Sequence, residues 1–185
     1  MSTLKVENLT GITSGANANK IIIPSGQTLE VTDNIRHDDL PAGTVVTVAD
    51  GTTSSYSSTN SQSFVATNLA CTITPKFSNS RIHLRVTGSV WFGTSNAASN
   101  YVIPTIYRGS TNIGTGSYNA LAFYGAHGTN NESWDRMITF ETIDVPNTTS
   151  ATTYTVYLKT YNNNHDGRLF EGITKNIITA LEIKQ

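Results

Sequence analysis

One stretch of alternating residues, 70–92, constrains the fold of this chain more than any other part of the sequence. Apolar and basic side chains alternate along its second half, and a period of two is typical of a β-strand with one buried face. The apolar positions are Ile82, Leu84 and Val86, and the positions between them are Arg81, His83 and Arg85. Such a strand needs a second layer over its apolar face, so the sequence predicts a sheet packed against another sheet.

The composition favours strands and turns throughout the chain. Only 14% of the 185 residues are charged, Thr, Ser and Asn are abundant, and windows rich in helix-forming residues are few. About eight strand-like segments separated by turn residues lie between residue 55 and the end of the chain. We therefore predict an all-β fold, an antiparallel two-sheet sandwich of jelly-roll type with a short N-terminal β-rich stem. Pro104 interrupts one expected strand and favours a sheet edge or a bulge there.

Residues 1–50 are predicted to form a stem, and residues 51–185 the sandwich head. Asp50-Gly51, at the boundary, is a strong turn signal. The stem is too small to bury its own apolar side chains, because isolated hairpins are only marginally stable in water. These side chains can pack on another copy of the chain, on the head or on a larger assembly, and we favour identical copies around an axis. The set is Ile21, Ile22, Ile23, Leu29 and Val31.

Charge and cysteine content exclude several classes of protein. The net charge is −1 and no basic block is present, so binding to nucleic acid or to an anionic membrane surface is not expected. The first residues lack the apolar run of a signal peptide, and no apolar stretch reaches the roughly twenty residues that span a bilayer. We expect synthesis in a host cytoplasm without membrane insertion. The single cysteine, Cys71, excludes a disulfide framework and is predicted to be a buried core residue.

The sequence contains no arrangement of residues typical of catalysis or metal binding. The charged cluster at residues 36–39 includes His37, but neighbouring residues of an extended chain project in different directions, so we interpret it as a solvated linker. The other histidines lack metal-ligand spacing, and no pair of carboxylates is singled out for glycoside hydrolysis. We predict that the protein is not an enzyme and uses no metal or other cofactor.

Polar loops are the expected binding elements. Loops at 93–100, 125–133 and 161–168 combine Asn, Gly, His and Asp with flanking aromatic residues, and such side chains can hydrogen-bond and pack against a sugar. The competing interpretation is that turns need Asn and Gly for backbone reasons and that the aromatic residues belong to the core. The candidate receptor or glycan contacts are Asn96, Asn100, His127, Asn130, Asn131, Asn163, His165 and Asp166.

Several segments resemble proteins of bacteriophage virions. Residues 64–73, the following Thr74-Pro75, residues 78–84 and residues 105–113 resemble the C-terminal head domain of tail-fibre and related virion appendage proteins. Residues 2–9 and 23–31 look like the short N-terminal parts of marine phage structural proteins. The resemblance implies a homotrimer in the virion, with the N-terminal segment attached to tail or capsid proteins and a jelly-roll head directed outward.

We therefore hypothesise a structural virion protein, a short trimeric tail fibre or appendage whose head contacts a glycan or protein of the host surface. Three alternatives stay open at this point. The first is a capsid decoration or head-fibre protein without a receptor, the second is a glycan-binding lectin-like module, and the third is a hydrolase of host polysaccharide.

Overall fold

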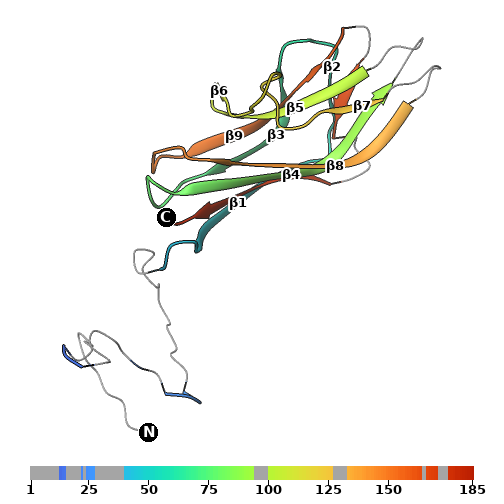
Figure 1. Cartoon of the computed structure of the whole chain (residues 1–185). Helices are drawn as coiled ribbons and strands as arrows, with labels where there is room; N and C mark the ends of the chain where they lie inside the picture. The colour runs from blue at the N-terminus through green and yellow to red at the C-terminus, as the bar shows by residue number, and fades with distance from the viewer. Residues whose placement is uncertain are drawn as a thin grey trace. The chain divides into compact units, whose positions relative to one another are not determined.

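The computed structural model describes residues 13–15, 22, 24–27, 40–93, 100–126, 133–163, 166–170 and 175–185. The chain divides into two units, Met1–Arg36 and His37–Gln185. All the described strands belong to the second unit, and the described residues contain no helix. This unit is an antiparallel sandwich of two β-sheets (Figure 1), which confirms the predicted all-β class.

The strands vary from short edge segments to long central strands. In chain order they are β1 (Val45–Thr53), β2 (Ser57–Thr59), β3 (Val65–Ile73), β4 (Arg81–Gly93), β5 (Asn100–Arg108), β6 (Thr111–Asn112), β7 (Tyr124–Ala126), β8 (Ser133–Asp144), β9 (Thr152–Thr160), β10 (Gly167–Leu169) and β11 (Asn176–Ile183).

The two sheets are built by nested pairing of early strands with late strands. In the first sheet, β8, β4, β11 and β1 lie side by side in that order, and β10 with its neighbour β2 extends the sheet along β4 beyond β11. In the second sheet, β3, β9 and β5 lie side by side, and β6 and β7 pair with the two ends of β5. Thus β1 pairs with β11, β3 with β9, β4 with β8, and β5 with β6 and β7.

The hydrophobic core lies between the sheets, where the alternation of the sequence places it. Ile82, Leu84 and Val86 of β4 are fully buried, as predicted. The second sheet covers them with inward-facing side chains of β9, among them Tyr154 and Val156. The residues of β4 between the buried ones face outward on the first sheet, so the predicted division of this strand into two faces is confirmed.

The expected turn at Asp50-Gly51 is wrong, because β1 runs through both residues and pairs with β11 along its length. The backbone of β3 packs so closely against Gly51 that a Cβ atom there would overlap the carbonyl oxygen of Ala70. Glycine is therefore needed here because the backbones of β1 and β3 approach each other closely, and not because the chain turns. Residues 45–50, expected in the stem, belong to the first sheet.

Candidate functional site

The three polar loops of the sequence connect strand ends that lie at one end of the sandwich. Gly93 pairs with Ser133 across β4 and β8, and Asn100 pairs with Ala126 across β5 and β7. Gly167 bridges the two sheets at this end, because it pairs with Phe92 of β4 while its backbone lies against the side chains of β5 and β9. The strands thus bring together the points at which the three loops leave the sandwich.

An aromatic pocket of about 600 Å³ lies at this end, on the outer face of the second sheet. Among the described residues it is lined by Tyr101, Tyr118, Phe123 and Tyr161. Three of the side chains are substantially exposed, with fractions of 44% for Tyr118, 42% for Phe123 and 48% for Tyr161. Exposed aromatic rings grouped around a hollow mark a binding surface more often than scattered apolar residues do.

The four rings form a closed circuit of contacts. The centroid of Tyr101 lies 4.5 Å from that of Phe123 and 5.5 Å from that of Tyr161, the latter at an interplanar angle of 82°. Tyr118 completes the circuit, at 5.2 Å from Phe123 and 6.3 Å from Tyr161. Each ring is therefore held at its edge or face by two neighbours, a geometry that stabilises aromatic groups.

Two of the rings are set by the strands of the second sheet. Tyr101 is the first residue of β5 whose side chain faces outward, and Tyr161 directly follows the last residue of β9. The Tyr161 amide donates to the Tyr101 carbonyl at 3.1 Å. The Tyr161 carbonyl in turn accepts from the Gln62 side-chain amide at 2.9 Å. The first bond extends the β5–β9 ladder by one residue and fixes the spacing of the two rings, and the second holds the Tyr161 backbone from the Gln62 side chain.

The other two rings lie on a segment folded over the outer face of β5. This segment is anchored where the Leu121 amide donates to the Pro104 carbonyl at 3.1 Å and the Thr105 hydroxyl donates to Asn112 Oδ1 at 2.8 Å. Pro104 lies between the stretch of β5 paired with β7 and the stretch paired with β6. The missing N–H of proline thus falls where neither short strand needs it, although β5 lies between β9 and β6/β7 and is not the sheet edge that Pro104 favours in the sequence.

Gly125 makes room for Tyr101. The two residues are register partners across β5 and β7, and a Cβ atom on Gly125 would overlap the Tyr101 ring. The ring can therefore lie across the backbone of β7 only because residue 125 has no side chain.

A smaller hollow of about 150 Å³ adjoins the aromatic pocket and adds polar groups to it. Lys159 is the charged residue of this hollow: its Nζ atom lies 3.2 Å from the Tyr118 carbonyl oxygen and 4.5 Å from the centroid of the Phe64 ring. The lining residues are Gln62, Ile103, Tyr118, Lys159, Thr160 and Tyr161. Because Tyr118 and Tyr161 line both hollows, the two form one site with an aromatic part and a cationic edge.

Few of the predicted contact residues fall within the described part of the chain. Asn163 and Asp166 are both exposed beside β9 and β10, and Asn100 is the first residue of β5. Of the predicted stem residues, Ile22 is 55% exposed. The other predicted contacts, Asn96, His127, Asn130, Asn131 and His165, lie outside the described residues, as do Ile21, Ile23, Leu29 and Val31.

The aromatic residues flanking the loops have different roles. Tyr101 and Tyr161 line the pocket, whereas the Trp91 ring on the first sheet lies beneath the Arg168 guanidinium at 4.3 Å. Tyr124 packs on the core and donates to the Thr139 carbonyl at 3.1 Å. Sequence reasoning missed Tyr118 and Phe123. The signal in the sequence is an apolar run between two turns. In the structure this run has no strand partner of its own.

The described residues offer no group of three or more His, Cys, Asp or Glu side chains that could hold a metal ion. Cys71 is 4% exposed, as predicted for a core residue. Burial, with a smaller contribution from Asp50, raises the pKa of its thiol to about 11, so the nucleophilic thiolate is scarce at neutral pH. His83 lies 3.4 Å from Glu141 on the outer face of the first sheet, far along β4 from the pocket.

Comparison with protein-family models finds no match for this chain, and comparison with curated proteins finds none. In the part of the chain that the structure describes, no helix has the length and apolarity needed to cross a membrane.

Proposed function

We propose that this chain is a structural protein of a bacteriophage virion, a short trimeric tail fibre or appendage whose sandwich head binds a glycan of the host surface. The position of the aromatic pocket is the observation that carries the proposal. The chain joins the first sheet at Val45, which pairs with Ile183, and Ile183 pairs with Arg81 at the start of β4. The pocket lies toward the opposite end of the sandwich, on the second sheet where β5 begins and β9 ends. A head attached through its N-terminal side would thus present the pocket outward.

The jelly-roll topology is part of the proposal, and the nested strand pairing supports it. A jelly roll arises when an antiparallel ribbon, in which the first strand pairs with the last and each inner pair follows, is rolled into two sheets. The pairs β1–β11, β3–β9, β4–β8 and β5–β6/β7 have this nesting, and the contacts β11–β4 and β9–β5 close the two sheets. Such heads occur in viral capsid and lectin domains.

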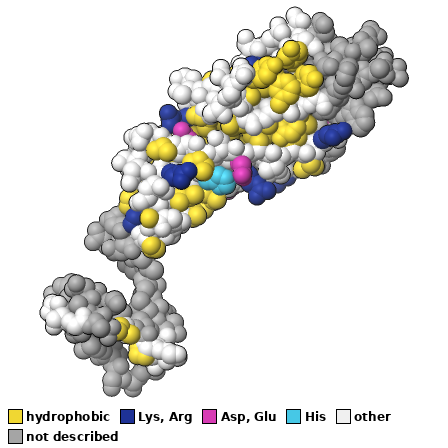
Figure 2. Space-filling model, viewed as in Figure 1, with side chains coloured by type: hydrophobic (Ala, Val, Ile, Leu, Met, Phe, Trp, Pro, Cys, Tyr) yellow, Lys and Arg dark blue, Asp and Glu magenta, His cyan; other side chains and the backbone are white. Residues whose placement is uncertain are grey.

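Self-association of the chain is supported by the outer face of the first sheet. One row of register partners crosses four strands and consists of Val48, Leu181, His83 and Ile143. In this row Val48 is 59% exposed and Ile143 is 48% exposed. Figure 2 shows hydrophobic side chains mixed with basic, acidic and histidine side chains on the visible surface of the molecule.

The neighbouring row of the same face carries both signs of charge. Its members are Asp50, Thr179, Arg85 and Glu141, again register partners from β1 to β8. A surface with an apolar row beside acidic and basic groups is complementary to further copies of itself, whereas a uniformly charged partner would meet like charge. We therefore take other copies of this chain, rather than an unrelated protein, as the occupant of this face.

Oligomeric state is the first test. Light scattering of the purified full chain is expected to give the mass of a trimer, and Val48→Glu is expected to shift the population toward monomer. Val65→Glu is the matched control, because Val65 is 41% exposed on β3 of the other sheet. A wild-type chain that stays monomeric at high concentration would contradict the trimeric appendage.

Cell binding tests the head. Fluorescently labelled full chain is expected to bind host bacteria, and Tyr161→Ala is expected to abolish most of that binding by opening the circuit of rings. Tyr56→Ala is the control, since Tyr56 is 54% exposed but lies away from the pocket, beside Arg168. Absence of binding by the wild type, together with immunogold label on the virion, would favour a decoration or head-fibre protein without a receptor. Absence of label on the virion would overturn the virion assignment itself.

A further inference from the structure

We infer that the pocket takes a pyranose that carries a carboxylate, and that Lys159 is the residue that recognises the carboxylate. This inference rests on the proposed glycan-binding function and adds the class of sugar. It starts from the division of the site into an aromatic part and a cationic edge, which share Tyr118 and Tyr161.

The aromatic part suits the ring of a sugar. Its described lining consists of four aromatic rings, and three of these are tyrosines whose hydroxyl groups can both donate and accept hydrogen bonds. A pyranose has an apolar face of C–H groups and an edge of hydroxyl groups, so it can lie against a ring face while its hydroxyls meet phenols or water. The volume of about 600 Å³ lies within the range of small-ligand sites.

The cationic edge makes the site selective for an anion. Lys159 is the only charged residue among the described residues that line either hollow. No carboxylate of the described residues forms an ion pair with it; its ammonium instead donates to the Tyr118 carbonyl and lies near the Phe64 ring. An ammonium has three donors, so two are left for a ligand.

The surrounding contacts hold the ammonium in place. Phe64 lies on one side at 4.5 Å from the Nζ atom, and the Tyr118 ring lies at 5.9 Å. Aromatic faces attract a cation but do not neutralise its charge. A carboxylate that projects from a pyranose in the aromatic part would therefore meet a positioned, uncompensated ammonium, and charge-assisted hydrogen bonds of this kind are stronger than those between neutral groups.

The test compares sugars that differ in one group. Methyl glucuronide and methyl glucoside are titrated against the folded full chain by saturation-transfer NMR, and acetate serves as a carboxylate without a ring. We expect the glucuronide to bind about ten-fold more tightly than the glucoside, and we expect added salt to reduce the difference. Binding of acetate as tight as that of the glucuronide would overturn the inference, because the ring would then contribute nothing.

Two lysine variants assign the preference to one residue. Lys159→Met keeps the length of the side chain and is expected to bind both glycosides equally, at the affinity of wild type for the glucoside. Lys175→Met removes the same charge from an exposed lysine outside both hollows and is expected to keep the preference. Thermal unfolding checks that each variant folds.

The possible results separate this inference from the proposed function. Equal binding of the two glycosides by wild type, or a preference that survives Lys159→Met, overturns the acidic-sugar inference and leaves a glycan-binding head. Failure of both glycosides to bind overturns the pyranose assignment, and the cell-binding experiment with Tyr161→Ala then decides whether the pocket serves another receptor.

Discussion

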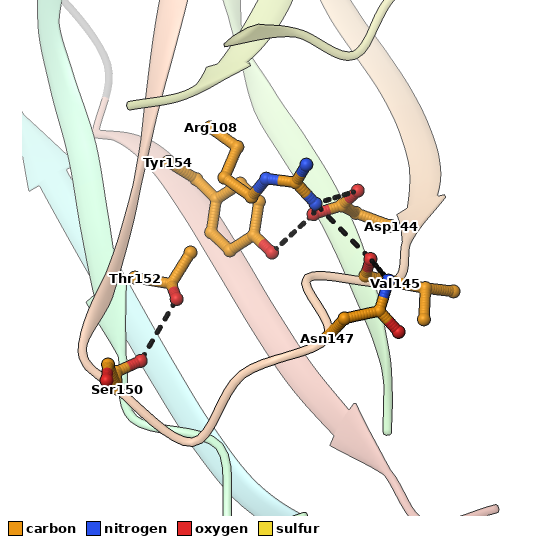
Figure 3. A network of polar contacts seen from close by, with 7 residues as sticks. All are labelled: Arg108, Asp144, Val145, Asn147, Ser150, Thr152 and Tyr154. Carbon is orange, nitrogen blue, oxygen red and sulfur yellow. Dashed lines mark hydrogen bonds and ion pairs between the residues drawn. The ribbon is translucent and has the colours of Figure 1, made fainter. Parts of the chain in front are cut away.

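The phenolic hydroxyl of Tyr154 donates a hydrogen bond of 2.7 Å to Oδ2 of Asp144, and this bond joins the two sheets of the sandwich. Tyr154 belongs to β9 of the second sheet and is fully buried, whereas Asp144 ends β8 of the first sheet. Arg108 of β5 approaches the same carboxylate with its Nη1 atom 2.9 Å from each oxygen (Figure 3). The carboxylate thus accepts bonds from two strands of the opposite sheet.

Asp144→Asn is expected to lower the free energy of unfolding by about 2 kcal/mol or more. The amide loses the charge that pairs with Arg108, and its N–H₂ group would face the donors of Arg108 or Tyr154. Urea unfolding followed by fluorescence measures the change. Asp135→Asn is the control, because Asp135 is an exposed carboxylate on the same strand. Equal stability of the two variants would show that the inter-sheet bond contributes little.

Cys71 is expected to make the protein less stable as the pH rises from about 9 to about 11. The pKa of the thiol is 9.0 in its ordinary state, and burial raises it to about 11 in the folded chain. As the pH rises, the thiol therefore ionises first in the unfolded chain. The stability that the protonated thiol contributes is complete below pH 9 and is lost as the pH rises through the pKa of the folded chain. The expected loss is of the order of 2 kcal/mol.

The measurement for Cys71 is the difference between wild type and Cys71→Val. Burial, and next its hydrogen bond to Asp144, also raises the pKa of Tyr154, so ionisation of this tyrosine lowers the stability of both proteins above about pH 10. Subtraction removes the part of this loss that the two proteins share, and leaves the titration of the thiol together with its smaller charge effect on Tyr154. If the two urea-unfolding profiles stay parallel from pH 8 to 11, the thiol does not titrate as expected.

Glu182 is expected to be one of the most sensitive polar positions of the head. Its side chain is fully buried in β11, and Oε1 accepts bonds from the amides of Lys76 and Phe77 and from the Ser80 hydroxyl, at 2.8, 3.1 and 2.7 Å. Glu182→Ala removes the acceptor of three donors, of which the Ser80 hydroxyl is buried and the two amides are partly buried, and should cost about 3 kcal/mol. Chemical unfolding measures the change.

Glu182→Gln tests whether the bonds themselves matter. It keeps one acceptor oxygen for the turn between β3 and β4, so its loss of stability is expected to fall between those of wild type and Glu182→Ala. Glu141→Gln, at a side chain 62% exposed, should stay close to wild type. A Glu182→Gln variant as unstable as Glu182→Ala would assign the effect to the negative charge rather than to the acceptor.

Gly51→Ala is expected to destabilise the sandwich strongly. The added Cβ would overlap the carbonyl oxygen of Ala70, which is backbone and can move only if β1 and β3 separate. Gly43→Ala is the control: its φ of +88° is costly for alanine, but no atom lies within 4 Å of the added carbon, so about 1 kcal/mol is expected. Thermal unfolding compares the two. A smaller loss for Gly51→Ala than for Gly43→Ala would contradict the packing of β1 on β3.

Local pattern was sufficient for the long strand β4 but not for the candidate site. The alternation of Ile82, Leu84 and Val86 with polar residues predicted both β4 and its buried face. Successive side chains of a strand point to opposite faces of the sheet, so the apolar set must share one face. The site depends instead on Tyr118 and Phe123, which lie in a segment without a repeating pattern. Their position is set by hydrogen bonds to β5, a strand that precedes them, and no local rule specifies that folding back.

Asp50-Gly51 is a case in which the local pattern predicted the wrong structure. The pair has strong turn chemistry, yet pairing with β11 and close packing on Ala70 keep both residues in a strand. Long-range contacts overrode the local preference because a ladder along all of β1 contributes more than one favourable turn.

Periodicity and composition were enough to predict the all-β class, the inward face of β4 and the burial of Cys71. The pairing of early strands with late ones, the pocket formed by four aromatic rings and the place of Lys159 at its edge became visible only in the folded chain. The physical reason is that register and sheet packing join residues far apart in the chain, whereas periodicity reports only which way each side chain points.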